Sequence, residues 1–180
     1  MSAVISDCGK YRYTLERRWG ISPLVAWVML NPSTADAAID DPTIRRCIEF
    51  SKRWGFGSMR VVNLYAYRAT DPSELKPLTY AERCGPLNAW HQHMALQDAA
   101  VVVAAWGGGR LDPLPSALIS YDKPLQCLKR LKDGSPGHPL YIAGDTPLTS
   151  WMVSDVPQRV PANMVPQKGT QSSGSGDANG

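Results

Sequence analysis

The sequence predicts an α/β protein, a three-layer sandwich in which helices cover a central, mainly parallel four-stranded sheet. Short apolar runs rich in β-branched residues alternate along the chain with amphipathic segments of helical length. This alternation is typical of a parallel sheet with helices on its faces. The run at 99–106 is apolar throughout, as expected of a strand in the middle of such a sheet.

Breaks in the apolar pattern set the ends of the predicted elements. Pro32 prevents the first strand from continuing, and Gly107 interrupts the third strand. Pro42 falls in the first turn of the first helix, where proline is tolerated. The predicted strands are 24–30, 60–67, 99–106 and 125–131, and the predicted helices are 42–55, 80–96 and 114–121.

The composition indicates one domain with an appendage. Residues 1–151 hold the α/β pattern, whereas 152–180 are rich in Pro, Gly, Ser and Gln and lack apolar periodicity, which predicts a disordered tail. A formal net charge of +3 permits nucleic-acid binding without indicating it. The longest apolar runs fall far short of the roughly 20 residues that cross a bilayer. We therefore expect a cytoplasmic protein that does not bind membranes.

The metal-ligating residue types are scattered rather than clustered. The sequence has no CxxC pair, which predicts neither a zinc site nor a disulfide framework but reduced, mostly buried thiols. His91 and His93 are two residues apart in a predicted helix, so they point to different faces. We expect no metal and no cofactor. The four cysteines are Cys8, Cys47, Cys84 and Cys127.

Three polar residues stand at or just beyond the carboxyl ends of predicted strands, where open α/β sheets bind their ligands. They are Asn31, Asn63 and His138. Asn63 interrupts a strand-like segment, and a buried carboxamide there must pair either with the edge of a nucleobase or with a neighbouring loop. Asn31 also suits a simple turn, and His138 also suits a structural position in a Gly-Pro loop.

Two further motifs have both a functional and a structural interpretation. The loop at 107–110 follows a strand and its amides suit an anion, yet it lacks the P-loop and dinucleotide spacings and also suits a plain turn. Asp40 and Asp41 suit general-base chemistry, and carboxylates ahead of a helix equally suit capping.

Five segments carry a family resemblance: YRYTLERRW, VMLNPSTADAAIDDPTIRRC, VVNLYAYRATDP, AAWG and GHPLYI, in that order between residues 8 and 151. They resemble a bacterial and phage family known as domain of unknown function 1643. We place this family within or near the uracil-DNA glycosylase superfamily, which implies a uracil-DNA glycosylase-like fold.

Individual motifs imply individual roles. MLNPS looks like the GINP motif of the mismatch-specific branch, which implies that Asn31 positions the attacking water. The stretch around Asn63 is similar to the base-recognition segment of the iron–sulfur branch. His138-Pro139 looks like the opening of the HPS motif, whose histidine stabilises the departing base. Tyr67 stands where the iron–sulfur branch has a cluster cysteine, so we expect no metal cluster.

The chain also departs from these motifs. Leu140 replaces the serine of HPS, and the water-activating aspartate of the GQDPYH motif is absent from the sequence, so hydrolysis rests on Asn31.

The resemblance predicts a monomeric DNA glycosylase-like hydrolase that removes a damaged or modified pyrimidine, in DNA repair or phage defence, and leaves an abasic site. One alternative is a nucleotide- or nucleic-acid-binding protein with the same fold and no catalysis, and another is a partner-binding protein. The expected catalytic residues are Asn31 and His138, the base-binding residues are Asn63, Pro32 and Tyr65, and the DNA-binding residues are Ser33, Arg45, Arg68, Leu140 and Tyr141, with Leu140 and Tyr141 as wedges between base pairs.

Overall fold

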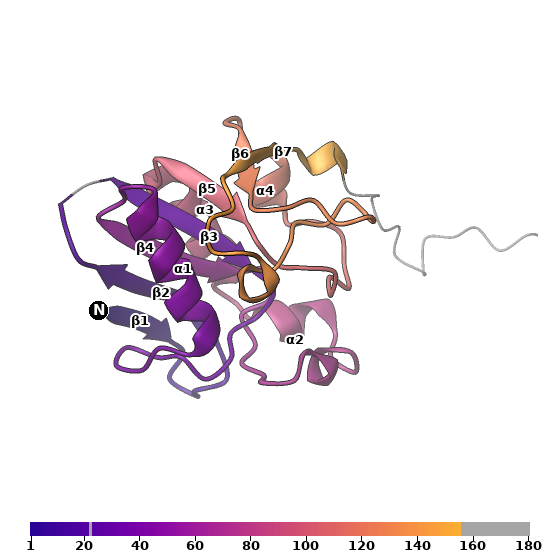
Figure 1. Ribbon diagram of the computed structural model, residues 1–180. Helices are drawn as coiled ribbons and strands as arrows, with labels where there is room; N and C mark the ends of the chain where they lie inside the picture. Colours follow the sequence, from indigo (N-terminus) through magenta and orange to yellow (C-terminus); the bar gives the residue numbers. More distant parts are fainter. Residues whose placement is uncertain (22, 156–180) are drawn as a thin grey trace, which may run out of the picture.

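The computed structural model describes residues 1–21 and 23–155, which form a mixed α/β domain built on one seven-stranded sheet (Figure 1). The strand order is β1-β2-β4-β3-β5-β6-β7. The strands are β1 Ser2–Ile5, β2 Arg12–Arg18, β3 Leu24–Met29, β4 Ser58–Asn63, β5 Val101–Ala104, β6 Leu125–Cys127 and β7 Thr149–Trp151.

The α/β class is confirmed, but the prediction of a four-stranded, mainly parallel sheet is wrong. The strands β4, β3, β5 and β6 pair in parallel, whereas β1, β2 and β7 add antiparallel pairs at both edges. These edge strands have no long apolar run, so the search for such runs missed them. Four of the seven residues of β2 are charged, and β7 is only three residues long.

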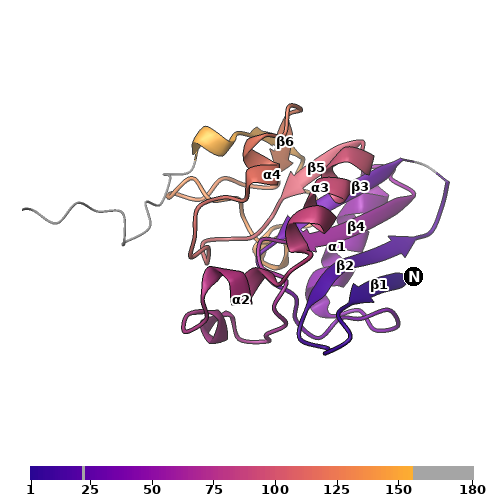
Figure 2. The ribbon, with the colours of Figure 1, turned by 180° about the vertical axis from the view of Figure 1, so that it is seen from behind.

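Helices cover both faces of the sheet (Figures 1 and 2). Alternate side chains of β3 point to opposite faces of the sheet. Trp27 packs in the hydrophobic cluster that includes α1, and Val28 packs in the cluster that includes α3. The helices are α1 Pro42–Arg53, α2 Tyr80–Cys84, α3 Asn88–Asp98 and α4 Ser116–Ile119, with 3-10 turns η1 Pro72–Leu75, η2 Pro139–Tyr141 and η3 Val153–Asp155.

The predicted helix at 80–96 is two helices. Gly85 has a φ of 67°, which ends α2 in a left-handed conformation, and Pro86 follows it. The helix predicted at 42–55 is confirmed as α1, with Asp41 as its N-cap residue and Pro42 in its first turn.

The domain continues into the segment predicted to be a tail. The turn η3 packs Val153 against the core, and Asp155 pairs with Arg130 at 2.6 Å. The rest of that segment, 156–180, lies outside the described residues.

All four cysteines are free, Cys47 and Cys127 are buried, and Cys8 is exposed. Within residues 1–21 and 23–155, no three His, Cys, Asp or Glu side chains gather as metal ligands. None of the helices described combines the length and apolar composition that a bilayer-spanning helix needs.

Arginines of β2 hold the long loop that connects β3 to α1. Arg17, 2% exposed, donates through Nε to Asp40 at 2.7 Å and through Nη2 to the carbonyl of Asp36 at 2.6 Å. Arg12 donates to the carbonyl of Ala35 at 2.6 Å. These hydrogen bonds fix the conformation of the loop against β2.

We predict that Asp40→Ala lowers the free energy of unfolding by about 3 kcal/mol, because it leaves the charge of Arg17 buried and unpaired. Glu49→Ala is the matched control, since Glu49 pairs with Arg46 on the surface and its removal costs under about 1 kcal/mol. Urea denaturation of both variants measures the difference. Equal losses in the two variants would contradict this account of the loop.

Candidate functional site

A pocket of about 550 Å³ opens at the carboxyl ends of the parallel strands. The segments after β3, β5 and β6 line it, together with the end of β4 and the start of α1. It brings together Asn31, Asn63 and His138, the three residues that the sequence places at strand ends. Ser33, Leu140 and Tyr141 line the same pocket.

Asn63 is the last residue of β4 and is 1% exposed. Its backbone carbonyl accepts hydrogen bonds from Gln92 at 2.7 Å and from Asn88 at 3.2 Å, which ties the strand end to α3. Its side-chain Oδ1 and Nδ2 find no partner among the described residues. Of the two interpretations of Asn63, pairing with a neighbouring loop is therefore wrong, because the carboxamide keeps both its donor and its acceptor for the pocket.

Asn31 is held in a single orientation. Its Nδ2 donates to the carbonyl of Ala69 at 2.8 Å and to that of Pro32 at 3.1 Å. These two bonds use both amide hydrogens, and no described residue donates to Oδ1. Asn31 therefore offers the pocket a fixed acceptor.

His138 caps the turn η2. Its Nδ1 accepts the backbone N–H of Leu140 at 3.3 Å, so the proton of the neutral ring is on Nε2. Burial lowers the pKa of His138, against the opposing charge of Asp41. At neutral pH the ring is thus an uncharged donor through Nε2.

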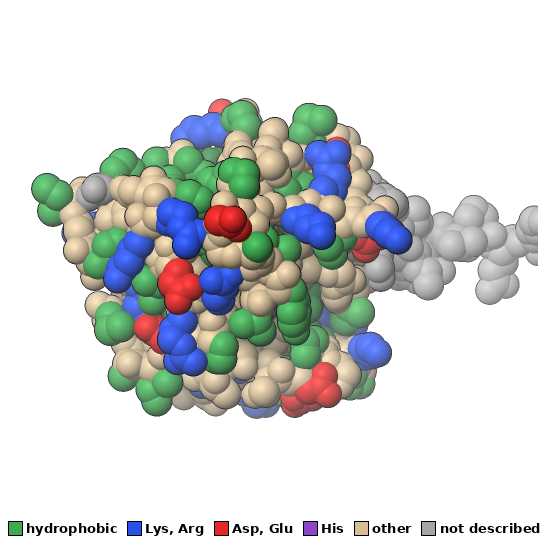
Figure 3. Space-filling model, in the orientation of Figure 1, with side chains coloured by type: hydrophobic (Ala, Val, Ile, Leu, Met, Phe, Trp, Pro, Cys, Tyr) green, Lys and Arg blue, Asp and Glu red, His purple; other side chains and the backbone are tan. Residues whose placement is uncertain are grey.

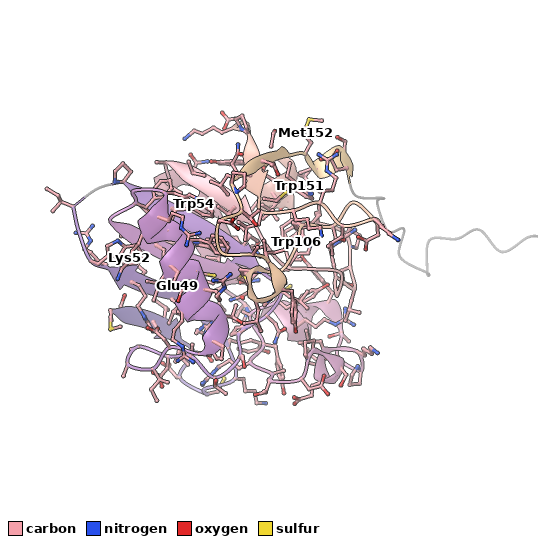
Figure 4. The ribbon with its side chains drawn as sticks, in the orientation of Figure 1. Glu49, Lys52, Trp54, Trp106, Trp151 and Met152 are labelled. Atoms are coloured by element: carbon pink, nitrogen blue, oxygen red, sulfur yellow. The ribbon has the colours of Figure 1, made fainter. Side chains whose placement is uncertain are left out.

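Trp106 closes the pocket directly after β5. It is 1% exposed and packs edge to face with Trp151, with ring centroids 5.1 Å apart (Figure 4). Its indole Nε1–H has no partner in the part of the chain that the structure describes. A buried indole N–H normally pairs. Trp106 therefore adds a second unused donor to the one on Asn63.

The glycine loop after Trp106 approaches its neighbours closely. A Cβ on Gly109 would lie 2.8 Å from Leu30, so a side chain there would displace the pocket wall. The Gly107 N–H donates to the carbonyl of Pro136 at 2.9 Å, which leaves it unavailable to an anion. The plain-turn interpretation fits this loop. Similarly, Asp41 caps α1 by accepting from Ile44 at 2.8 Å, although it also lines the pocket.

Four of the residues expected at the site lie outside the pocket lining. Tyr65 is buried, and its hydroxyl accepts the N–H groups of Leu111 at 2.8 Å and Asp112 at 3.0 Å. Burial raises its pKa to about 12, and the hydroxyl anchors the backbone at 111–112. Pro32 acts through its carbonyl, which orients Asn31.

The two arginines outside the lining also contact backbone. Arg45 is exposed and donates to the carbonyl of Asp40, and Arg68 donates to that of Gly9. The sequence analysis assigns no role at the site to Trp106 or Arg12, yet both line the pocket. The position of Trp106 at the end of a predicted strand is the signal that could have identified it as a site residue. Arg12 lies on a strand that the pattern of apolar runs did not predict.

The family described as "Protein of unknown function (DUF1643)" matches residues 12–140. The chain belongs to this family. The part that belongs to DUF1643 begins at Arg12 and includes Asn31, Asn63, Trp106 and His138, so the family match spans the strand-end residues of the pocket. No curated protein and no solved structure matches the chain.

We predict that Asn63→Leu stabilises the ligand-free protein by about 1 to 2 kcal/mol, because it replaces an unpaired buried amide with an apolar group of similar size. Gln92→Leu is the control, since Gln92 is a buried amide that donates to the same strand-end carbonyls, and its loss costs about 1 kcal/mol. Chemical denaturation gives both values. Destabilisation of the Asn63 variant by as much as the control would refute the idea of an unused carboxamide.

His138 should titrate below its ordinary value of 6.5, because burial disfavours the charged ring. The unfolded chain then binds more protons than the folded one as the pH falls through 6.5, so the contribution of His138 to stability is complete above that pH and declines below it. Ring ¹H–¹⁵N NMR spectra report both the pKa and the tautomer. A pKa at or above 6.5, or a proton on Nδ1 at neutral pH, would contradict the assignment.

Proposed function

We propose that the protein is a DNA glycosylase-like hydrolase that cleaves the N-glycosidic bond of a damaged or modified pyrimidine and leaves an abasic site. The observation that carries the proposal is the unpaired, buried carboxamide of Asn63 in one pocket with Asn31 and His138. Such a carboxamide is unfavourable in the empty protein and becomes favourable when a ligand pairs with it.

The edge of a pyrimidine suits the groups that the pocket leaves unused. A carboxamide pairs its donor and its acceptor with a base edge in one plane. The indole N–H of Trp106 supplies one more donor for an exocyclic oxygen. Asn63 and Trp106 are each 1% exposed, so a base that does not match them would leave them buried and unpaired and would be rejected.

The remaining two polar residues fit the chemistry of the reaction. When the C1′–N bond breaks, its electron pair leaves with the base, so the sugar becomes oxocarbenium-like and negative charge develops on the base. Water then forms the new bond to C1′ and releases its proton to solvent. The fixed Oδ1 of Asn31 accepts a hydrogen bond from that water and aligns it. The Nε2–H of His138 donates to the base oxygen, an interaction worth roughly 2.7–4 kcal/mol for one well-placed donor.

The outer surface suits entry of a flipped nucleotide. Tyr141, 82% exposed, and Leu140, 40% exposed, stand at the pocket rim on η2, where apolar side chains suit the gap that a flipped base leaves. Lys and Arg side chains gather on the face that carries α1, and a phosphate backbone favours such a face (Figure 3). The proposed partner is DNA that carries a damaged or modified base. The exposed basic residues of α1 are Arg45, Lys52 and Arg53.

A second candidate is a protein that binds a nucleotide or nucleic acid without hydrolysis. The observation that favours it is the identity of the acidic group in the pocket. Asp41 is the one carboxylate in the described lining, and one of its oxygens caps α1. The attacking water would then lack a dedicated base.

We predict base release from at least one member of a panel of oligonucleotides that carry uracil, mismatches or modified pyrimidines, detected as alkali-labile sites. Asn31→Ala should lower the single-turnover rate at least about 100-fold, and His138→Ala by about 10²–10³-fold. His93→Ala is the matched control, because His93 is exposed on α3 outside the pocket and its loss leaves the rate unchanged.

The outcome distinguishes the two candidates. Saturable binding of the panel without any base release would overturn the hydrolase and favour the non-hydrolytic binder. Base release that survives in both pocket variants would place the chemistry elsewhere on the molecule.

A further inference from the structure

Arg12 is a buried cation that forms no ion pair within the described part of the chain. It is 2% exposed and lines the pocket. Its Nη1 donates to the carbonyl of Ala35, but its Nε has no partner among residues 1–21 and 23–155. It forms an ion pair with none of the carboxylates described. A buried charge normally has an oppositely charged partner.

Arg17 shows how the same strand satisfies a guanidinium. It is as buried as Arg12, yet it pairs with Asp40 and donates to two backbone carbonyls of the loop after β3. The difference between the two arginines is position, because Arg12 reaches the pocket and Arg17 does not line it. Of these two buried arginines of β2, the one without an ion-pair partner is therefore the one that lines the pocket.

A β-bulge in β2 turns the side chain of Arg12 toward the pocket. Thr14 pairs with Val4, whereas Arg12 pairs with Ile5, so Tyr13 is an extra residue between them. Tyr13 turns toward α3 and stacks on His91, with ring centroids 5.0 Å apart and planes at 9°. Bulges of this kind redirect a side chain and are common beside functional sites.

Arg12 has the electrostatics of a buried cation. Burial lowers its pKa to about 10; the charges of Asp41 and Asp36 oppose this shift, and the charges of Arg68 and Arg17 add to it. Arg12 nevertheless remains charged at neutral pH, so an anion that reaches it gains a strong, desolvated partner.

We propose that the ligand of this pocket carries an oxyanion that binds Arg12. The proposal rests on the proposed function in that the pyrimidine is placed at Asn63. The pocket, at about 550 Å³, lies in the range that holds a drug-sized molecule, so it accommodates more than a bare pyrimidine ring. The oxyanion is either an acidic substituent on the base or the phosphate of the nucleotide, and a guanidinium binds both through the same geometry.

Isothermal titration of the full chain with two matched pairs of probes tests the proposal. Uracil is compared with 5-carboxyuracil, and uridine is compared with uridine 5′-monophosphate. We expect the charged member of one pair to bind about 10- to 100-fold more tightly than its neutral partner. The pair that shows the difference identifies the source of the oxyanion.

Substitution of Arg12 assigns that preference to one side chain. Arg12→Gln, with folding checked by circular dichroism, should reduce the preference to within about twofold, and Arg12→Lys should retain part of it because it keeps the charge. Arg18→Gln is the control, since Arg18 is an exposed arginine of the same strand outside the pocket lining and its loss leaves the preference unchanged. If Arg12→Gln does not fold, the comparison of Arg12→Lys with the native protein still reports the loss of the bidentate geometry.

The inference and the proposed function fail separately. Any one of three results would overturn the oxyanion site. They are equal affinity within both pairs, absence of binding by both charged probes, and a preference that neither Arg12 variant changes. Base release from neutral pyrimidines that is insensitive to Arg12 would leave the hydrolase intact and refute the inference. A preference that depends on Arg12, without base release from any oligonucleotide, would support the oxyanion site and refute the hydrolase.

Discussion

The parallel register of β3 against β4 is the constraint on which the site depends. It pairs Met29 with Asn63, and the N–H groups of Leu64 and Tyr65 continue the pairing to the carbonyls of Met29 and Leu30. Asn31 and the end of β4 are therefore fixed at one edge of the sheet. A slip of one residue would move Asn63 to the other face, where α3 packs, and would bury the carboxamide away from the pocket.

Around this edge the protein concentrates groups that it does not satisfy. Arg12, Asn63 and Trp106 each hold a buried polar atom without a partner in the described structure, and all three line one pocket. Among the described residues, only Arg68 Nε and Asn88 Oδ1 are in the same state outside the pocket lining, whereas a buried donor such as Trp27 Nε1 is paired, with Ser51 at 3.0 Å. Unsatisfied groups that lower stability and gather in one cavity indicate a preorganised ligand site, since the ligand supplies the missing partners. The ligand that we propose, planar, polar at one edge and negatively charged, would supply partners to these groups.

The sequence predicts the centre of this fold better than its edges. The apolar run that forms β5 and the Asn-Pro stop after β3 identify parallel strands and the end at which Asn31 stands. The predicted strand 60–67 runs through Asn63, whereas β4 ends there. The antiparallel strand β2 is not predictable from apolar runs, because its buried positions include Arg12 and Arg17, whose burial depends on a tertiary loop. Likewise, a pattern cannot show that a carboxamide stays unpaired or that a bulge redirects Arg12. Those properties depend on contacts between segments that are distant in the chain.

The structure of the Asn31→Ala variant bound to the pyrimidine-containing oligonucleotide that binds it most tightly would test the central claim most directly. The account predicts one nucleotide turned out of the helix, with the edge of its base about 2.7–3.2 Å from Oδ1 and Nδ2 of Asn63. It also predicts His138 Nε2 at the base oxygen. A base that remains stacked in the DNA, or a turned-out base whose edge pairs with residues other than Asn63, would contradict the account.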